Sequence, residues 1–202
     1  LAQPDLAKAR GRRDLIMLSV LYDTGARVQE LADLKVRNVR LDPPPIMTLT
    51  GKGRKTRQVP LMSNTESLLK QYMAETHLLQ NGLQDCPLFF NSQRGKLTPK
   101  GISFILNKYV SRAKTISSII PDKVTPHSFR HTKAMHLLQA GVNLVYIRDI
   151  LGHVDISTTE IYARTDTELK RKALEKAYPD MISTKLPHWT QDEDLLAWLI
   201  NF

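Results

Sequence analysis

The chain has 202 residues, of which 42% are hydrophobic, and this is enough apolar material to bury the core of one domain, with or without a small appendage. Its 29 lysines and arginines outnumber its 20 acidic residues, so the net charge is +9 and a polyanionic partner such as nucleic acid is favoured. The single cysteine, Cys86, excludes an internal disulfide and any metal site built from several cysteines.

The first expected elements are two helices. Apolar residues recur at helical spacing over residues 15–22 and 28–34. Gly25 stands between them, and glycine is common just past a helix end because it adopts a positive φ at little steric cost. A sharp turn is therefore predicted between the two helices.

A β-hairpin is expected next. After three consecutive prolines, residues 46–50 and 56–61 have strand character. They flank the stretch GKGRK at residues 51–55, whose glycines and cations predict an exposed turn. The hairpin is therefore expected to carry a strongly basic tip.

Four further helices are expected along the rest of the main domain, at residues 68–79, 102–113, 134–138 and 144–151. Capping residues mark three of the starts: Ser63 with Glu66, Thr98 before a proline, and Thr125 before a proline. After a linker-like stretch, a last amphipathic helix is expected at residues 195–200. The predicted fold class is α+β, mainly α with one small hairpin or sheet.

The cellular setting is predicted from what the sequence lacks. No apolar run approaches the ~18 residues that span a bilayer, and the first residues have no signal-peptide pattern. With one cysteine, the chain fits the reducing cytoplasm. It begins with Leu1 rather than Met, so we expect it to be a piece of a longer protein.

Arg27 and Glu30 are the first candidate site residues. They stand three apart just after Gly25, so on a helix they share one face and either pair with each other or point together into a site. The alternative is an exposed ion pair of little energetic value.

His127 and Arg130 also stand three apart, directly after the cap at Thr125 and Pro126. The first turn of a helix suits an anion, because its free backbone N–H groups and the helix dipole attract negative charge. An arginine fork binds two phosphate oxygens at once. The alternative is a structural cap made by His127.

His153 and Tyr162 follow the last main-domain helix. Gly152 lets the chain turn, so that His153 projects away from the helix end. Tyr162 comes nine residues later, in a short helix that Ser157 and Glu160 would start. By itself, a lone tyrosine is more often a core or surface residue.

Lys52 is the candidate at the hairpin tip. Glycine on both sides allows close approach of a ligand, and a mobile ammonium can follow a DNA groove. We expect the neighbouring Arg54, Lys55 and Arg57 to contact DNA. The alternative for Lys52 is a solvated turn lysine.

Taken in order, these motifs resemble those of the tyrosine recombinases, also called phage integrases, over about residues 12–164. The stretch TGARVQEL at 24–31 resembles the family's first arginine box, and HSFRHT at 127–132 resembles its His-x-x-Arg box. Leu151-Gly152-His153 followed by Tyr162 is similar to its third box and nucleophile. Ala26 and Phe129 stand where leucine is common in the family.

The resemblance implies that Tyr162 is the nucleophile, that Arg27 and Arg130 clamp the scissile phosphate, and that Lys52 is the general acid. Two fixed guanidiniums stabilise charge on phosphate oxygens, so neither a metal nor another cofactor is expected.

Three further residues would complete the site. The resemblance implies that His127 and His153 belong to the pocket and that Glu30 orients its neighbours. Because a phenol with a pKa of about 10 is a weak nucleophile at neutral pH, a base is needed, and His127 is our candidate.

The same resemblance implies an assembly and a domain organisation. Site-specific cleavage and rejoining of double-stranded DNA, by recombination or integration, would proceed through a 3′-phosphotyrosyl intermediate without ATP, in a homotetramer on two DNA sites. Residues 1–182 would form the catalytic domain. Residues 183–202 would form a linker and a helix that docks on a neighbouring protomer or within its own, and a bacterial or phage origin is expected.

Three alternatives remain. A non-catalytic DNA-binding module would use the arginines only as phosphate anchors. A metal-dependent nuclease would use His127 and His131, which stand at ligand spacing on one helix face. A type IB topoisomerase would share the chemistry but not the outcome.

Overall fold

The computed structural model describes residues 1–121, 123–153 and 159, all of which belong to one compact unit, residues 1–164. The predicted nucleophile Tyr162 and the predicted C-terminal helix lie outside the described residues. The fold class is confirmed as mainly α with one small antiparallel sheet. None of the described helices is long and apolar enough to cross a membrane.

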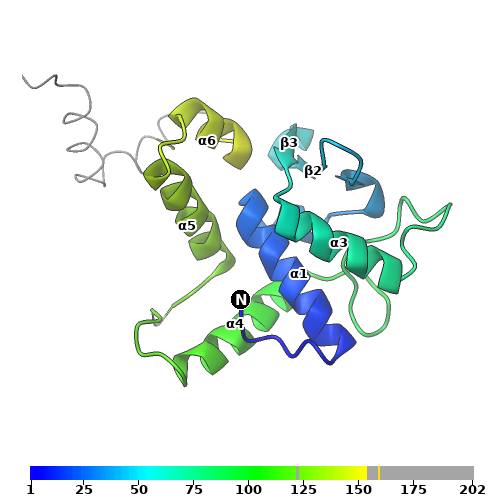
Figure 1. Ribbon diagram of the computed structural model, residues 1–202, viewed down its shortest axis with the longest axis horizontal. Coiled ribbons are helices and arrows are strands. Elements are labelled where there is room, and N and C mark those ends of the chain that lie inside the picture. The colour runs from blue at the N-terminus through cyan, green and yellow to red at the C-terminus, as the bar shows by residue number, and fades with distance from the viewer. Residues whose placement is uncertain (122, 154–158, 160–202) are drawn as a thin grey trace, which may run out of the picture. The chain divides into compact units, whose positions relative to one another are not determined.

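Helix α1 (Ala9–Thr24) is the central element of this unit. Apolar residues on it, including Met17, Val20 and Leu21, are fully buried. Helices α3 (Ser63–Glu75) and α5 (Pro126–Gln139) both pack against it (Figure 1). The predicted turn after α1 is confirmed, because Gly25 has a φ of 58° and its N–H bonds to the Tyr22 carbonyl.

The sheet contains the expected hairpin and one additional short strand. Strands β2 (Ile46–Thr50) and β3 (Thr56–Pro60) pair in antiparallel register, with Met47 opposite Val59. Strand β1 (Val39–Arg40) pairs with β2 on the other side. Its two residues are too short to produce a periodic signal, which explains why the sequence does not predict it.

The remaining elements of the described residues are five helices, of which α4 is the longest. They are α2 (Val28–Ala32), the 3₁₀ helices η1 (Val36–Asn38) and η2 (Lys52–Arg54), α4 (Pro99–Lys114) and α6 (Leu144–Leu151). Thr98 and Thr125 cap α4 and α5 through their side chains, as predicted. The predicted cap at Ser63 is wrong, because Met62 is the N-cap of α3 and Ser63 is already its first helical residue.

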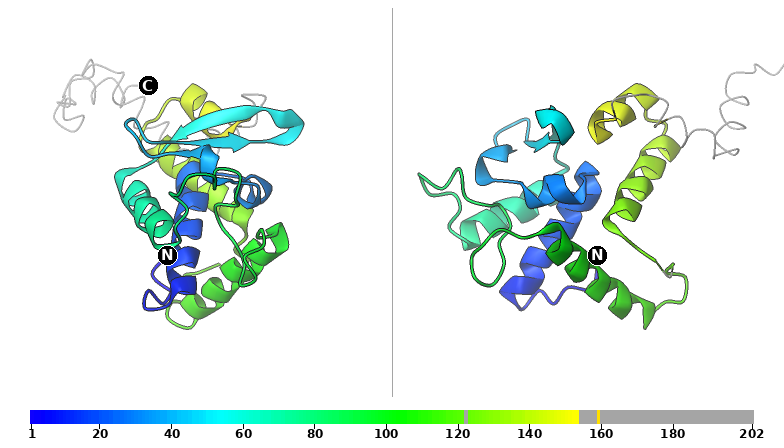
Figure 2. Two further views of the ribbon diagram at one scale, coloured as in Figure 1. Left: turned by 90° about the vertical axis from the view of Figure 1, so that its right-hand side faces the viewer. Right: turned by 180° about the vertical axis from the view of Figure 1, so that it is seen from behind.

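Helix α6 brings a distant part of the chain to the hairpin. It packs against α5 through Ala134, Ile147 and Leu151, and its end also contacts β3 (Figure 2). The end of α6, the turn between α1 and α2, and the tip end of the hairpin therefore meet at one place.

Candidate active site

Glu30 lies where the start of α2, the hairpin and the end of α6 come together. It lies in the first turn of α2 and is only 3% exposed. Its carboxylate accepts a hydrogen bond from the backbone N–H of Arg27 at 2.8 Å and from Nη1 of Arg27 at 2.9 Å. Arg27 is the N-cap of α2, so the pair forms around the helix start, and the alternative of an exposed pair is wrong for Glu30.

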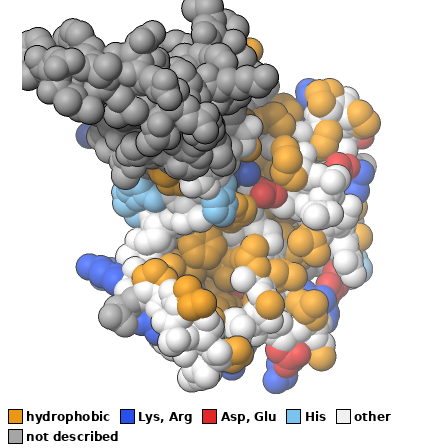
Figure 3. All heavy atoms as spheres, turned by 60° about the vertical axis from the view of Figure 1, so that its left-hand side comes forward, with side chains coloured by type: hydrophobic (Ala, Val, Ile, Leu, Met, Phe, Trp, Pro, Cys, Tyr) orange, Lys and Arg blue, Asp and Glu red, His pale blue; other side chains and the backbone are white. Residues whose placement is uncertain are grey.

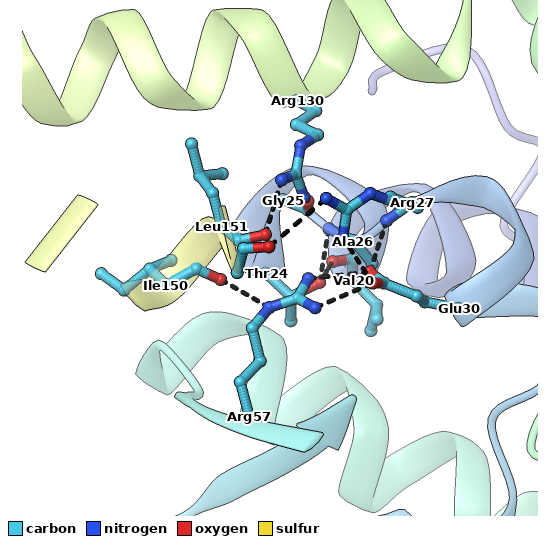
Figure 4. Close-up of polar contacts among 11 residues, drawn as sticks. Val20, Thr24, Gly25, Ala26, Arg27, Glu30, Arg57, Arg130, Ile150 and Leu151 are labelled. Atoms are coloured by element: carbon cyan, nitrogen blue, oxygen red, sulfur yellow. Dashed lines mark hydrogen bonds and ion pairs between the residues drawn. The ribbon is translucent and has the colours of Figure 1, made fainter. Parts of the chain in front are cut away.

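Arg57 approaches the same carboxylate from β3. Its Nη1 and Nη2 donate to the two oxygens of Glu30 at 2.8 Å and 2.7 Å, and its Nε donates to the carbonyl of Ile150 at 2.8 Å (Figure 4). The Arg57 side chain is 11% exposed. Arg57 is therefore largely buried, whereas Arg54 and Lys55, the other predicted DNA contacts of the hairpin, are exposed.

The pKa of Glu30 reflects this environment. Burial alone raises the pKa of a carboxyl, but the hydrogen bonds and charges of Arg57 and Arg27 outweigh it and hold the pKa at about 2, below its ordinary 4.5. Glu30 is consequently ionised at pH 7.

Arg130 joins two of the converging turns from the side of α5. It is 3% exposed, and its Nη1 donates to the Gly25 carbonyl at 2.7 Å while its Nη2 donates to the Leu151 carbonyl at 2.5 Å. The end of α1 and the end of α6 are thus held by one guanidinium (Figure 4). Arg27 adds a longer contact from Nη2 to the Gly152 carbonyl, at 3.4 Å.

His153 lies just past α6, beside these cations. Its Nδ1 is 2.9 Å from the hydroxyl oxygen of Thr159. Burial, followed by the positive charges of Arg130, Arg27 and Arg57, lowers the pKa of His153 from 6.5 to about 4. The ring is therefore neutral at pH 7, so it can offer a ligand a hydrogen bond but no charge.

A pocket of about 650 Å³ opens between these groups and the hairpin. It is lined by residues from the α2 start, the hairpin and the end of α6: Arg27, Gly51, Lys52, Lys55, Thr56, Arg57, Asp149, Gly152 and His153. Five of these carry predicted site roles. The pocket is strongly cationic, with one carboxylate at Asp149 that pairs with Arg148.

The other predicted residues lie as follows. Arg54 is exposed at the hairpin tip. His127 is exposed in the first turn of α5, and its ring lies edge to face with that of His131, with centroids 4.3 Å apart. Within residues 1–121, 123–153 and 159, no group of three or more His, Cys, Asp or Glu residues that could hold a metal ion is formed.

Sequence reasoning missed Thr159 as the partner of His153. Thr159 is completely buried and lies six residues further along the chain. No charge, spacing or capping pattern marks it in the sequence.

Comparison with known proteins identifies the family of the chain. Residues 2–168 match the profile of the phage integrase family. The tyrosine recombinase XerC of Oceanobacillus iheyensis is 39% identical over 178 residues, which cover 87% of this chain and 56% of the relative. A putative integrase/recombinase, y4rC, of Sinorhizobium fredii is 37% identical over 98% of this chain and 58% of its own. The chain thus spans a little over half the length of these relatives.

Solved structures give the same result. The XerA recombinase matches with a TM-score of 0.67 and 28% identity, over 83% of this chain and 57% of its own. The XerH site-specific recombinase bound to its palindromic difH substrate matches with a TM-score of 0.68 and 27% identity, over 85% of this chain and 47% of its own. With the family profile covering more than half of its residues, the chain belongs to the phage integrase family of tyrosine recombinases.

Proposed function

We propose that this chain is the catalytic part of a site-specific DNA recombinase that cleaves and rejoins double-stranded DNA through a 3′-phosphotyrosyl bond to Tyr162. The observation that carries the proposal is the cationic pocket, where Arg27, Lys52 and His153 of three separate motifs line one cavity. The XerH relative, whose structures are bound to its DNA substrate before and after cleavage, supports the proposal of DNA cleavage.

The chemistry follows from the charges in the pocket. The phenolate oxygen of Tyr162 attacks the phosphorus, the bond to the 5′ oxygen breaks, and that oxygen takes a proton from Lys52. Negative charge on the non-bridging oxygens is stabilised by Arg27, with Arg130 as the second arginine. These guanidiniums supply the positive charge that a metal ion supplies in many other phosphoryl-transfer enzymes.

Two histidines have different proposed roles. His127 is the base that accepts the phenol proton of Tyr162. His153 is neutral at pH 7, so its role is to hydrogen bond to the scissile phosphate rather than to add charge. Glu30 does not react, because it is buried, ionised at pH 7 and bonded to Arg27.

The test is detection of a covalent protein–DNA adduct on a denaturing gel. A nicked suicide substrate made from the DNA that flanks the gene is incubated with wild type and with Tyr162→Phe, in the presence of a chelator. We expect an adduct with the wild type only. DNA binding without an adduct or cleavage would favour the non-catalytic module, and metal-dependent cleavage that leaves no adduct and stops in chelator would favour the nuclease.

A second assay separates recombinase from type IB topoisomerase. Both enzymes form the adduct, but only a recombinase transfers the cleaved strand to a second duplex carrying the same site. Relaxation of supercoiled DNA of arbitrary sequence, without strand transfer, would identify a topoisomerase.

The proposed working unit is a homotetramer on two DNA sites. Exposed apolar side chains support this proposal, because contact with a neighbouring protomer would remove them from water: Phe104 is 73% exposed, Ile116 74% and Ile119 89%. Hydrophobic side chains gather in a broad central patch on one face of the described part (Figure 3). Light scattering of the chain with and without site DNA measures the stoichiometry, which we expect to rise on DNA.

The remaining proposals concern organisation and setting. We expect residues 1–182 to be the catalytic domain and residues 183–202 to dock as a linker and helix. A cytoplasmic setting in a bacterium or a phage-infected cell is supported by the bacterial organisms of the relatives.

A further inference from the structure

Arg57 lies on the inner face of the hairpin. It stands two residues before the buried Val59 on β3 and opposite the fully buried Leu49 on β2. Side chains alternate along a strand, so Arg57 points to the same side as these apolar residues. The exposed cations of the hairpin tip, Lys52 and Lys55, differ from it in this respect.

The guanidinium of Arg57 connects three parts of the chain. It makes a bidentate pair with Glu30 of α2, and its Nε reaches the Ile150 carbonyl near the end of α6. Charge-assisted bidentate pairs are short, strong and directional. Since Arg57 and Ile150 are 93 positions apart, the contact fixes a distant helix end relative to the hairpin.

Two glycines allow the backbone to close around this group. A Cβ on Gly152 would lie 2.8 Å from Cδ of Arg57 and 3.0 Å from its Nη1. A Cβ on Gly51 would lie 3.0 Å from Oε1 of Glu30. Any side chain at Gly152 would therefore displace Arg57, and the Gly152 turn rests directly on it.

The same contacts reach two proposed catalytic groups. Oε1 of Glu30 accepts from Arg57 and from Arg27, so the two arginines share one acceptor. His153 follows Gly152 immediately, on the turn that lies against Arg57. Moving Arg57 would change both sides of the pocket at once.

We propose that Arg57 is a positioning residue of the active site, which joins Glu30 to the end of α6 and thereby fixes Arg27 and His153 at the separation that the scissile phosphate requires. This inference rests on the proposed strand-cleavage function. It assigns Arg57 a role through other residues, whereas the sequence predicts a direct contact with DNA.

The test uses this 202-residue chain with Arg57→Gln, Arg57→Lys and the control Lys70→Gln. Lys70 is an exposed lysine of α3 that pairs with Glu66, outside the pocket. DNA affinity is measured by titration, and single-turnover cleavage of the nicked substrate is measured at saturating DNA. Circular dichroism and thermal melting verify that each variant is folded at the assay temperature.

For Arg57→Gln we expect the cleavage rate at saturation to fall roughly 10- to 100-fold, because small displacements of reacting groups are costly. The dissociation constant for DNA should change little, about threefold at most, as expected for an arginine outside the phosphate contacts. Arg57→Lys should recover only part of the rate, since an ammonium cannot make the bidentate pair. Lys70→Gln should match the wild type.

A DNA-free measurement runs in parallel. In wild type the N–H of Gly152 bonds to the Asp149 carbonyl at 3.2 Å, and that of His153 to the Arg148 carbonyl at 3.1 Å. We expect these two amides to exchange hydrogen at least about tenfold faster in Arg57→Gln, through local opening of the turn. Amides in the middle of α1 should be unchanged.

The outcomes separate the inference from the function. A rate at saturation that stays at the wild-type level, with weaker DNA binding and full recovery in Arg57→Lys, would overturn the positioning role in favour of a phosphate contact. Unchanged exchange at Gly152 and His153 would also overturn it. If the wild type cleaves no DNA that it binds, the proposed function fails, and the exchange measurement alone then decides whether Arg57 positions the turn. If Arg57→Gln is unfolded, Arg57→Lys decides both arms.

Discussion

At the scale of single residues, Glu30 determines the electrostatics of the site. It is buried, yet two arginines keep its pKa at about 2. An isolated buried carboxylate would instead have a raised pKa. The carboxylate can therefore be both buried and ionised only because Arg57 and Arg27 donate hydrogen bonds to it from two elements.

This pKa makes the stability of the protein depend on pH. Because the folded-state pKa is below the unfolded-state value near 4.5, the contribution of Glu30 is present above pH 4.5 and is lost as the pH falls toward 2. From the size of the shift it amounts to about 3 kcal/mol. We expect Glu30→Gln to lower the free energy of unfolding by about this amount at pH 7.

Urea unfolding of wild type and Glu30→Gln between pH 7 and pH 2 checks the prediction. The difference between the two proteins should shrink below pH 4.5. Glu66→Gln is the control, since its i,i+4 pair with Lys70 contributes only about 0.3–0.5 kcal/mol. A difference that is constant across the range would show that Glu30 is not held ionised by its partners.

His153 provides a second prediction at this scale. Its pKa of about 4 means that the ring stays neutral through pH 5 in the folded protein. Because the unfolded chain binds a proton near pH 6.5, His153 also makes the folded state less stable as the pH falls from 6.5 to 4. An NMR titration of the ring protons should give a midpoint near 4, and a midpoint near 6.5 would contradict the burial of the ring and the crowding of cations around it.

Among the elements, the end of α6 depends on a glycine. Gly152 has a φ of 65°, a conformation that costs other residues roughly 1 kcal/mol or more. A Cβ added at this position would also lie 2.8 Å from Cδ of Arg57. The Arg57 side chain cannot move away freely, because its guanidinium is held by the pair with Glu30. Two separate costs therefore oppose any substitution at this position.

We expect Gly152→Ala to lower the free energy of unfolding by about 2–4 kcal/mol, as the sum of backbone strain and overpacking. Gly141 is a matched control, since it follows α5 with a φ of 78° and has no atom within 4 Å of a Cβ. Gly141→Ala should cost only the backbone term, about 1–2 kcal/mol. Chemical denaturation of both variants measures the difference, and equal losses would argue against the Arg57 contact.

Local signals predict these elements where the contacts are local. The Thr125 cap of α5 forms because a threonine hydroxyl accepts from the N–H of Ser128 three residues on. The start of α3 is mispredicted because Ser63 and Glu66 have the spacing of a capping box. The helix begins one residue earlier than that pattern predicts, so Ser63 is its first helical residue rather than its N-cap. Strand β1 exists only because β2 is there to pair with it.

For the molecule as a whole, the charge of +9 and the cationic pocket predict salt-dependent DNA binding. Each phosphate contact that a lysine makes adds about 0.9 to the slope of log affinity against log salt. Lys55 is exposed at the hairpin and lines the pocket. We expect Lys55→Gln to reduce the slope by about one.

Fluorescence anisotropy with a labelled duplex between 50 and 200 mM salt, a range over which such complexes weaken by orders of magnitude, measures the slope. Lys70→Gln is the control, because Lys70 lies outside the pocket and pairs with Glu66. A slope that Lys55→Gln leaves unchanged would remove the hairpin from the DNA interface.

The sequence by itself determined the class of fold, the hairpin with its basic tip, and the motifs that mark the family. These depend on spacing, capping and glycine, which act over a few residues. Only the tertiary structure decided which groups the arginines contact. Arg130 bonds to carbonyls 105 and 21 positions away, and Arg57 to one 93 positions away. Such partners are chosen by how helices and strands pack, and no pattern within a short stretch of sequence contains that information.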